Sequence, residues 1–225
     1  MEEFKLELRK INKKSEIIYH TCVMYIGDDP EFREAIEKTK EETFFYEECR
    51  EPEYSTEDLC VFTALLSVNK YNRVQGTYYM GNSEEEDPDT LTWEMLSNCH
   101  LSAFYNNTLN NKLENFSQTK KLKGIGHFIL CLIIKDILRN NILQPDQYIT
   151  LEASGYIKGK EKQGLVRYYE SIGFSQAFPY LFEIGLEQSN VPMKARLIDV
   201  LSKCENAKIS SDIKKVEKII NLKKM

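Results

Sequence analysis

Alternating hydrophobic and polar positions recur along the chain, and this period of two residues is typical of a β-strand with one buried face. Residues 3–9 place Phe4, Leu6 and Leu8 on one side of the chain and charged residues on the other. The stretch 148–153 alternates in the same way. We therefore predict a strand over each of these two ranges.

A second group of strands is predicted from runs of β-branched and aromatic residues, or from short apolar stretches that flank turn-forming residues. The predicted ranges are 60–68, 74–80, 100–105, 113–118 and 178–186. Residues 69–73 are expected to form the turn between the first two of these strands, and the asparagine-rich residues 106–111 to join the third and fourth as a hairpin. The sheet is therefore expected to be antiparallel up to Lys120. The acidic residues 84–89 are expected to lie in a surface loop.

Apolar residues at helical spacing predict helices in other parts of the chain. The predicted ranges are 30–45, 127–138, 165–172, 192–203 and 211–222. Asp29 followed by Pro30 is a typical helix start, and Gly173 is expected to end its helix in the left-handed conformation. Because nearly every position of 128–134 is apolar, that helix is expected to be covered on most sides. Periodicity thus predicts a mixed α/β domain.

The 225 residues and 42% hydrophobic content are sufficient for one domain with a sizeable core. A net charge of -5 argues against a nucleic-acid-binding protein, because contact with many phosphates needs a concentrated basic surface. The N-terminus lacks the pattern of a signal peptide, and the longest apolar run, 128–134, is too short to cross a bilayer. We therefore expect an intracellular, cytoplasmic protein that contacts neither nucleic acid nor membrane.

The 6 cysteines and 3 histidines are scattered along the chain. Their spacing matches neither a zinc site nor a catalytic triad, and it does not indicate a disulfide framework. The carboxylates of 84–89 lack the spacing of a calcium loop. We expect reduced, mostly packing cysteines and no metal site.

Two glycines precede the apolar helix in the segment Lys121-Leu-Lys-Gly124-Ile-Gly126. Glycines at this spacing let the backbone turn tightly with its N–H groups converging, and the following helix adds the positive end of its dipole. Such a segment is suited to an anionic group, and a phosphate-bearing cofactor is the first hypothesis. The alternative is that the glycines serve as a turn and nothing more.

A second segment, Gly164-Leu-Val-Arg-Tyr168-Tyr169-Glu-Ser-Ile-Gly173-Phe174, lies downstream. Together the two segments resemble the GCN5-related N-acetyltransferase (GNAT) superfamily, whose acetyl-CoA loop reads Gln/Arg-x-x-Gly-x-Gly/Ala and whose later helix ends in an aromatic-Tyr-Glu-x-x-Gly-Phe pattern. Lys121 stands where the family usually has Gln or Arg, and Lys162 where it often has Asn. The resemblance covers about residues 99–185 well and the remainder loosely.

The resemblance implies a mostly antiparallel sheet flanked by helices, in which strands 113–118 and 148–153 are parallel neighbours that splay apart around the cofactor, acetyl-CoA. The residues it places on the cofactor are Phe116, Ser117, Gln118, Lys121, Leu122, Lys123, Gly124, Ile125 and Gly126. A side chain at Gly126 is expected to occupy the volume of the phosphates, so that a bulky substitution abolishes cofactor binding and leaves the fold largely intact.

Tyr169 aligns with the family tyrosine that protonates the departing thiolate, and Tyr168 is the alternative donor. Tyr169 also shares a helical face with Leu165 and Ile172, which is consistent with a packing role. Glu114 is the candidate base for the amine, and Glu152 is a second.

The resemblance therefore predicts an acetyl-CoA-dependent N-acetyltransferase that acts on a primary amine, either a polyamine, a lysine side chain or a protein N-terminus. Two alternatives stay open. One is an inactive GNAT-like domain that binds acetyl-CoA or a protein partner, and the other is an interaction domain without a cofactor. The expected organisation is an acyltransferase domain over 1–205 and a helical extension over 206–225, whose apolar stripe is suited to a homodimer contact.

Overall fold

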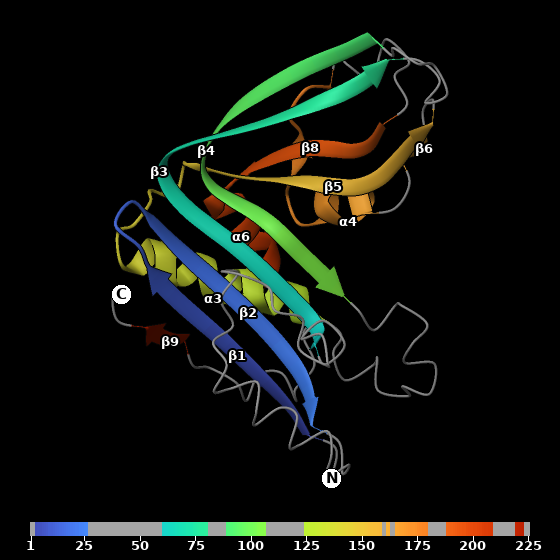
Figure 1. Ribbon diagram of the computed structural model, residues 1–225. Helices are drawn as coiled ribbons and strands as arrows, with labels where there is room; N and C mark the ends of the chain where they lie inside the picture. The colour runs from blue at the N-terminus through green and yellow to red at the C-terminus, as the bar shows by residue number, and fades with distance from the viewer. Residues whose placement is uncertain are drawn as a thin grey trace, which may run out of the picture.

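The computed structural model describes residues 3–26, 60–80, 89–106, 124–158, 161–162, 165–179, 188–208 and 219–222. Their strands are β1 Glu3–Asn12, β2 Glu16–Ile26, β3 Cys60–Met80, β4 Asp89–Asn106, β5 Tyr148–Lys158, β6 Glu161–Lys162, β7 Ser175–Gln176, β8 Gln188–Arg196 and β9 Ile219–Leu222 (Figure 1). The described helices are α3 Ile125–Arg139, α4 Leu165–Ser171 and α6 Leu197–Glu205. Several predicted elements fall outside these ranges, namely helix 30–45, strand 113–118 and most of 84–89, 178–186 and 211–222.

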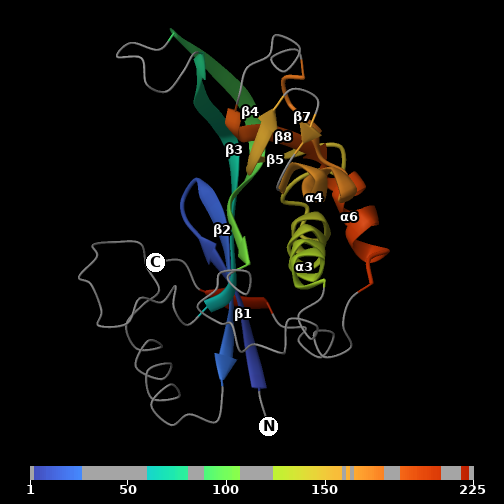
Figure 2. The same cartoon turned by 90° about the vertical axis from the view of Figure 1, so that its right-hand side faces the viewer.

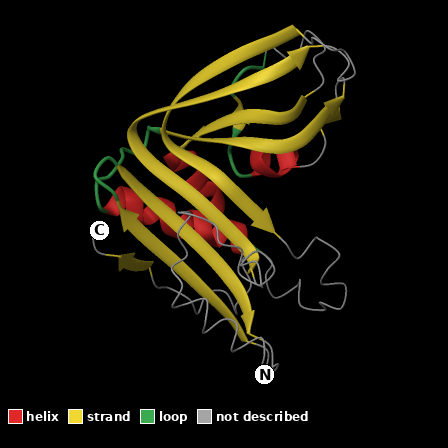
Figure 3. Cartoon of the chain, viewed as in Figure 1, coloured by secondary structure: helices red, strands yellow, loops and turns green. Residues whose placement is uncertain are grey.

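The strands form one nine-stranded sheet in the order β7-β8-β5-β4-β3-β2-β1-β9, and β6 pairs with β5 beside this path. Neighbours from β1 to β4 are antiparallel, whereas β4 pairs with β5 and β1 with β9 in parallel. The prediction of a mixed α/β fold with a largely antiparallel sheet is therefore confirmed. Figure 3 shows how strongly the strands dominate the described part of the chain.

The turn predicted over 69–73 is wrong, because β3 continues through these residues as one strand. Its pairing with β4 shifts register between Val68 and Asn72, so the ladder is irregular where a turn was expected. Such an irregularity bends a strand without ending it, and Figure 1 shows β3 and β4 curving together at this point. The predicted strands 60–68 and 74–80 are two arms of a single strand.

No strand was predicted over β2 or over the first part of β4. In β4 the side chains of Trp93, Met95 and Ser97 are buried while those between them are exposed. This is the alternation of a strand that has one covered face. The segment follows directly on the acidic stretch, and Asp89, expected in the loop, opens β4 instead.

The C-terminal helix predictions need two corrections. Residues 192–196 belong to β8, in which Val191, Met193 and Ala195 are buried on one face and pair across to β5. The helix predicted over 192–203 therefore begins later, at Leu197. In the predicted helix 211–222, the last four residues form β9 and add to the outer edge of β1. Phe178 and Pro179 are described and are not in a strand.

All three described helices lie on the same face of the sheet (Figure 2). The predicted helix 127–138 is confirmed as α3, whose covered residues include Ile129, Leu130, Ile133 and Ile134. They pack against buried side chains of the sheet and of α6 in one continuous hydrophobic cluster. Helix α3 thus lies in the middle of the core, as its apolar sequence predicts.

The C-terminal end of α3 is attached to the sheet by a polar cluster. Asp136 Oδ2 accepts hydrogen bonds from Lys10 Nζ on β1 and Tyr19 Oη on β2, each at 2.6 Å. Asp136 Oδ1 accepts a third from Asn140 Nδ2 at 2.9 Å. Lys10 is 8% exposed, so its ammonium group is compensated by this carboxylate in a largely dry position.

Candidate functional site

The parallel ladder between β4 and β5 is short. It joins Cys99, His100 and Leu101 to Ile149, Thr150 and Leu151. Beyond Leu101, β4 stays paired with β3 as far as Asn106, whereas beyond Leu151 β5 stays paired with β8. The two strands therefore diverge, and in Figure 1 their ends point away from each other.

The strand pair differs in part from the prediction. Strand 148–153 does have a parallel neighbour from which it separates, as expected. That neighbour is β4 over Cys99–Leu101, whereas the predicted partner, 113–118, lies outside the described residues.

Helix α3 begins next to this divergence, as the contact between Gly126 and Phe104 of β4 indicates. Gly124 precedes the helix in the left-handed conformation, with φ 85°, which favours glycine. Its carbonyl accepts the N–H of Phe128 at 3.0 Å, the first bond of the helical ladder. The N–H groups of the first turn have no acceptor within the helix itself and point out of its N-terminal end. This end is thus suited in polarity to a negative group.

The surroundings of Gly126 give a packing reason for glycine at this position. A Cβ atom at this position would lie 2.7 Å from Phe104 Cζ and 2.8 Å from Tyr168 Oη. The space beside Gly126 is therefore filled by two aromatic side chains of the protein, and a larger residue would disturb their packing. A bulky substitution is therefore expected to disturb the packing of α3 against β4 and α4 in addition to any effect on cofactor binding.

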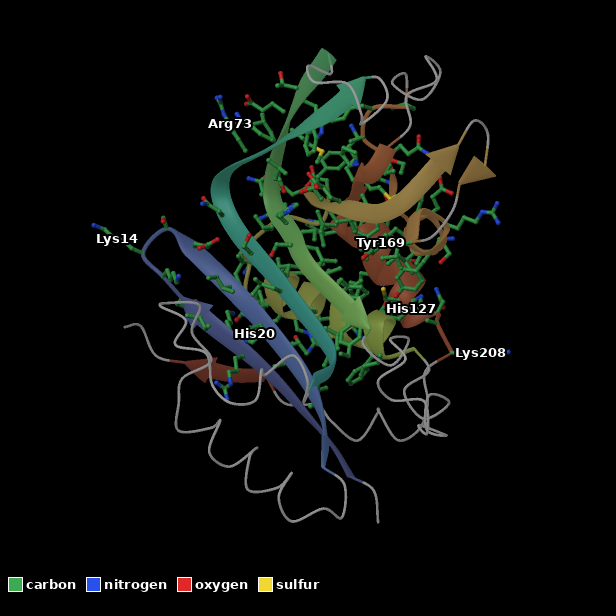
Figure 4. The ribbon with its side chains drawn as sticks, turned by 45° about the vertical axis from the view of Figure 1, so that its right-hand side comes forward. Lys14, His20, Arg73, His127, Tyr169 and Lys208 are labelled. Atoms are coloured by element: carbon green, nitrogen blue, oxygen red, sulfur yellow. The ribbon has the colours of Figure 1, made fainter. Side chains whose placement is uncertain are left out.

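The aromatic side chains around Gly126 form a cluster that joins three elements. The Tyr168 ring lies 5.5 Å from His127 at the start of α3 and 6.4 Å from Phe104 on β4. Tyr169 lies 6.2 Å from Phe104 and 5.8 Å from Phe174. Tyr168 of the second motif is thus brought to the start of α3, with Tyr169 beside it against Phe104, which sequence spacing alone does not reveal. Figure 4 shows Tyr169 and His127 on one side of the molecule, with His20 away from them on β2.

The two tyrosines differ in exposure. Tyr169 is 3% exposed and belongs to the continuous core, whereas Tyr168 is partly exposed at the edge of that core. Burial raises the pKa of Tyr168 above its ordinary value, so its hydroxyl stays protonated at neutral pH and is a weaker acid than a free tyrosine. Tyr168 is therefore better placed to meet a bound molecule, and Tyr169 has the packing position that its helical face predicts.

The end of α4 is built as expected. Gly173 has φ 100°, and its N–H donates to the carbonyl of Glu170 at 3.1 Å. The N–H of Phe174 donates to the carbonyl of Tyr169 at 3.0 Å. These two bonds define a Schellman motif, which turns the chain sharply back toward the sheet. The predicted left-handed cap at Gly173 is confirmed.

Among the other predicted site residues, Ile125 and Glu152 are described. Ile125 is buried at the start of α3, and it contributes packing as well as a first-turn N–H. Glu152 follows the shared ladder on β5 and is exposed, although partial desolvation raises the pKa of its carboxyl above the usual value. The remaining predicted residues, Glu114, Phe116, Ser117, Gln118, Lys121, Leu122 and Lys123, lie outside the described ranges.

Three described cysteines, Cys99, Cys131 and Cys204, are buried and free, in keeping with a packing role. Within the described ranges no group of three His, Cys, Asp or Glu side chains is placed to hold a metal ion. None of the helices described above combines the length and apolar character needed to span a membrane. Comparisons with protein-family models, curated proteins and solved structures gave no match to this chain.

Proposed function

We propose that the protein is an acetyl-CoA-dependent N-acetyltransferase that acetylates a primary amine. The observation that carries the proposal is the divergence of the parallel strands β4 and β5 beside the start of α3. The described residues of the two motifs that resemble the GNAT superfamily lie at the start of α3 and in and after α4, and these helices meet at this point through Tyr168. The proposal therefore joins two independent observations, a sequence pattern and a strand arrangement.

In this proposal the nine residues given above for the cofactor, from Phe116 to Gly126, bind acetyl-CoA, and its diphosphate lies at the N-terminal end of α3. Gly124 suits this role because its left-handed backbone starts the helix without a side chain. Bound acetyl-CoA supplies an activated acyl group. A tyrosine of α4 donates the proton that the departing thiolate requires. The resemblance assigns this role to Tyr169, whereas partial exposure favours Tyr168. Glu114 and Glu152 are the bases predicted from the sequence.

A second candidate function is an inactive GNAT-like domain that binds acetyl-CoA or a protein partner. The observation in its favour is the aromatic filling beside Gly126, where Phe104 and Tyr168 occupy space next to the helix start. Lys121 and Lys162 also favour the inactive domain, since each replaces a residue that the family often uses for contacts.

Thermal unfolding with increasing acetyl-CoA tests the binding step. Stabilisation should grow with ligand concentration, to about 2.7 kcal/mol at a hundredfold excess over the dissociation constant. Acetyl-pantetheine, which lacks the diphosphate, is the matched control and should stabilise the protein less. Equal stabilisation by both compounds would exclude a diphosphate site at α3, and no stabilisation by either would exclude acetyl-CoA binding.

Consumption of acetyl-CoA with a panel of amines separates the two candidate functions. The panel should include a polyamine, a lysine-containing peptide and a peptide with a free N-terminus. Turnover with one of these classes supports the transferase. Binding of acetyl-CoA without turnover of any amine supports the inactive domain.

A further inference from the structure

A row of polar side chains crosses the short ladder between β4 and β5. Ser97 Oγ donates to the carbonyl oxygen of Cys99 at 2.7 Å, and Thr150 Oγ1 donates to Ser97 Oγ at 2.6 Å. His100 Nδ1 lies 3.0 Å from Thr150 Oγ1. Ser97 and Thr150 are buried, at 2% and 0% exposure, so these hydroxyl groups depend on one another for hydrogen bonds.

The tautomer of His100 depends on which way these hydroxyl groups donate. When Ser97 donates to the carbonyl of Cys99 and Thr150 donates to Ser97, the hydrogens of both hydroxyl groups are used. Thr150 Oγ1, which also lies 3.4 Å from the carbonyl oxygen of Cys99, then has only acceptor capacity toward His100. In this arrangement neutral His100 carries its hydrogen on Nδ1, and the lone pair of Nε2 is available to accept a proton.

His100 lies where β4 and β5 are about to diverge. Its chain neighbours Cys99 and Leu101 belong to the core, so alternation directs the His100 side chain to the other face of the sheet. Desolvation lowers the pKa of His100 below its ordinary value and keeps the ring neutral at pH 7. Its partner on β3 is the uncharged Ser67, and Thr150, its partner on β5, is uncharged as well. The nearest acidic position on that face of β5 is Glu152, two residues further on.

Resting on the proposed acetyltransferase function, we propose that His100 is the base that deprotonates the acceptor amine, held in its Nδ1–H form by Thr150. The amine nitrogen forms a bond to the acyl carbon, and its proton passes to Nε2 of His100. The carbon–sulfur bond breaks, and the thiolate receives its proton from a tyrosine of α4. His100 then gives its proton to solvent and the tyrosine takes a proton from solvent, which restores the neutral ring and the phenol.

The state of the His100 ring is measurable without turnover. Long-range ¹H–¹⁵N correlation spectra of the ring nitrogens distinguish the two neutral tautomers, and with 3 histidines in the chain the signals are assignable by substitution. We expect protonated Nδ1 and bare Nε2 for His100 in the wild-type protein. Thr150→Val should remove this preference, whereas Thr150→Ser should retain it. A wild-type ring protonated on Nε2 would overturn the proposal.

Kinetics test the chemical role. His100→Gln should lower kcat on the order of 10²- to 10⁴-fold, with the KM for acetyl-CoA little changed. It should also abolish the acidic limb of the pH profile, that is, the fall of kcat at low pH that protonation of His100 causes. Thr150→Val should shift the acidic limb, which a merely structural role would not do. His20→Gln is the control, and thermal unfolding of each variant checks folding.

The outcomes separate the two proposals. A wild-type protein that turns over no amine refutes the transferase and the base together. An active wild type whose His100→Gln variant keeps its kcat and pH profile refutes the base alone. Loss of the acidic limb on Glu152→Gln instead of His100→Gln would transfer that role to Glu152.

Discussion

The carboxylate of Asp136 is predicted to be among the most sensitive positions of the fold. It lies in the last turn of α3, where the helix dipole disfavours a negative charge by about 0.3–1 kcal/mol. The ammonium of Lys10, whose side chain is 10% exposed, forms an ion pair with this carboxylate and compensates for the unfavourable dipole. Asp136→Ala leaves that ammonium and the hydroxyl of Tyr19 without their acceptor.

Removal of one partner from a buried ion pair costs about 3–5 kcal/mol. The relief of the dipole repulsion offsets less than about 1 kcal/mol of this. We therefore expect Asp136→Ala to lower the free energy of unfolding by about 3–5 kcal/mol, out of a total of about 5–15 kcal/mol for a domain. In a chain of this length the loss corresponds to a fall in Tm of about 6–20 °C.

Urea unfolding at pH 7 measures the effect, and the ion pair between Lys135 and Glu205 provides a matched control. This pair also involves α3, with 2.9 Å between Nζ and Oε1, but both side chains are partly exposed. Glu205→Ala should therefore cost less than about 1 kcal/mol. The triple variant Lys10→Met, Tyr19→Phe and Asp136→Leu removes all the stranded groups together. It should recover most of the lost stability, because apolar residues replace buried ion pairs well.

A loss of stability in Asp136→Ala no larger than that in Glu205→Ala would show that the buried ion pair contributes little. A triple variant as unstable as Asp136→Ala would show that packing volume, rather than uncompensated charge, explains the loss.

Three further predictions follow from the residues around α3 and the sheet. Gly126→Ala should destabilise the fold by about 1–2 kcal/mol in urea unfolding, since overpacking against Phe104 exceeds the gain in helix propensity; a stabilised variant would contradict this. Tyr169→Phe or Tyr168→Phe should lower kcat about ten- to a thousandfold with little change in the KM for acetyl-CoA. If neither does so in steady-state assays, both tyrosines are removed from the mechanism. Burial and the bond to Asp136 raise the pKa of Tyr19, so the native state keeps a proton that the unfolded chain loses above about pH 10. Above this pH the free energy of unfolding should therefore fall by up to about 1.4 kcal/mol per pH unit, and it should fall less steeply in Tyr19→Phe. Urea unfolding between pH 8 and 11 measures this dependence, and an equal dependence in the wild type and the variant would contradict the prediction.

Helices and strands whose apolar residues follow one clear periodicity were predictable from the sequence. Helix α3 is apolar on nearly all sides, and α4 ends in a glycine that the left-handed region requires. Residues 192–196 of β8 were predicted as helix because their alternating residues run directly into the helical spacing of Leu197 and Val200. The apolar residues of β9 are compatible with either structure, and pairing with β1 decides between them.

The candidate site was predictable to a smaller extent. The motifs identified Gly126 and Tyr169, which do lie in one region of the fold. Phe104 and His100 carry no local signal, because their importance depends on contacts with residues far along the chain. The register of β4 against β5 creates those contacts, and register between distant strands is not encoded in spacing.

The pairing of β9 with β1 has a consequence for the order in which the protein assembles. Leu8 is opposite Ile219, and closing so large a loop is costly until the intervening chain has folded. During synthesis the outer edge of β1 therefore stays without this partner until residues 219–222 have emerged from the ribosome. The charged residues Lys5, Glu7 and Arg9 on β1 discourage intermolecular strand pairing in that interval, so the nascent chain carries its own protection against aggregation.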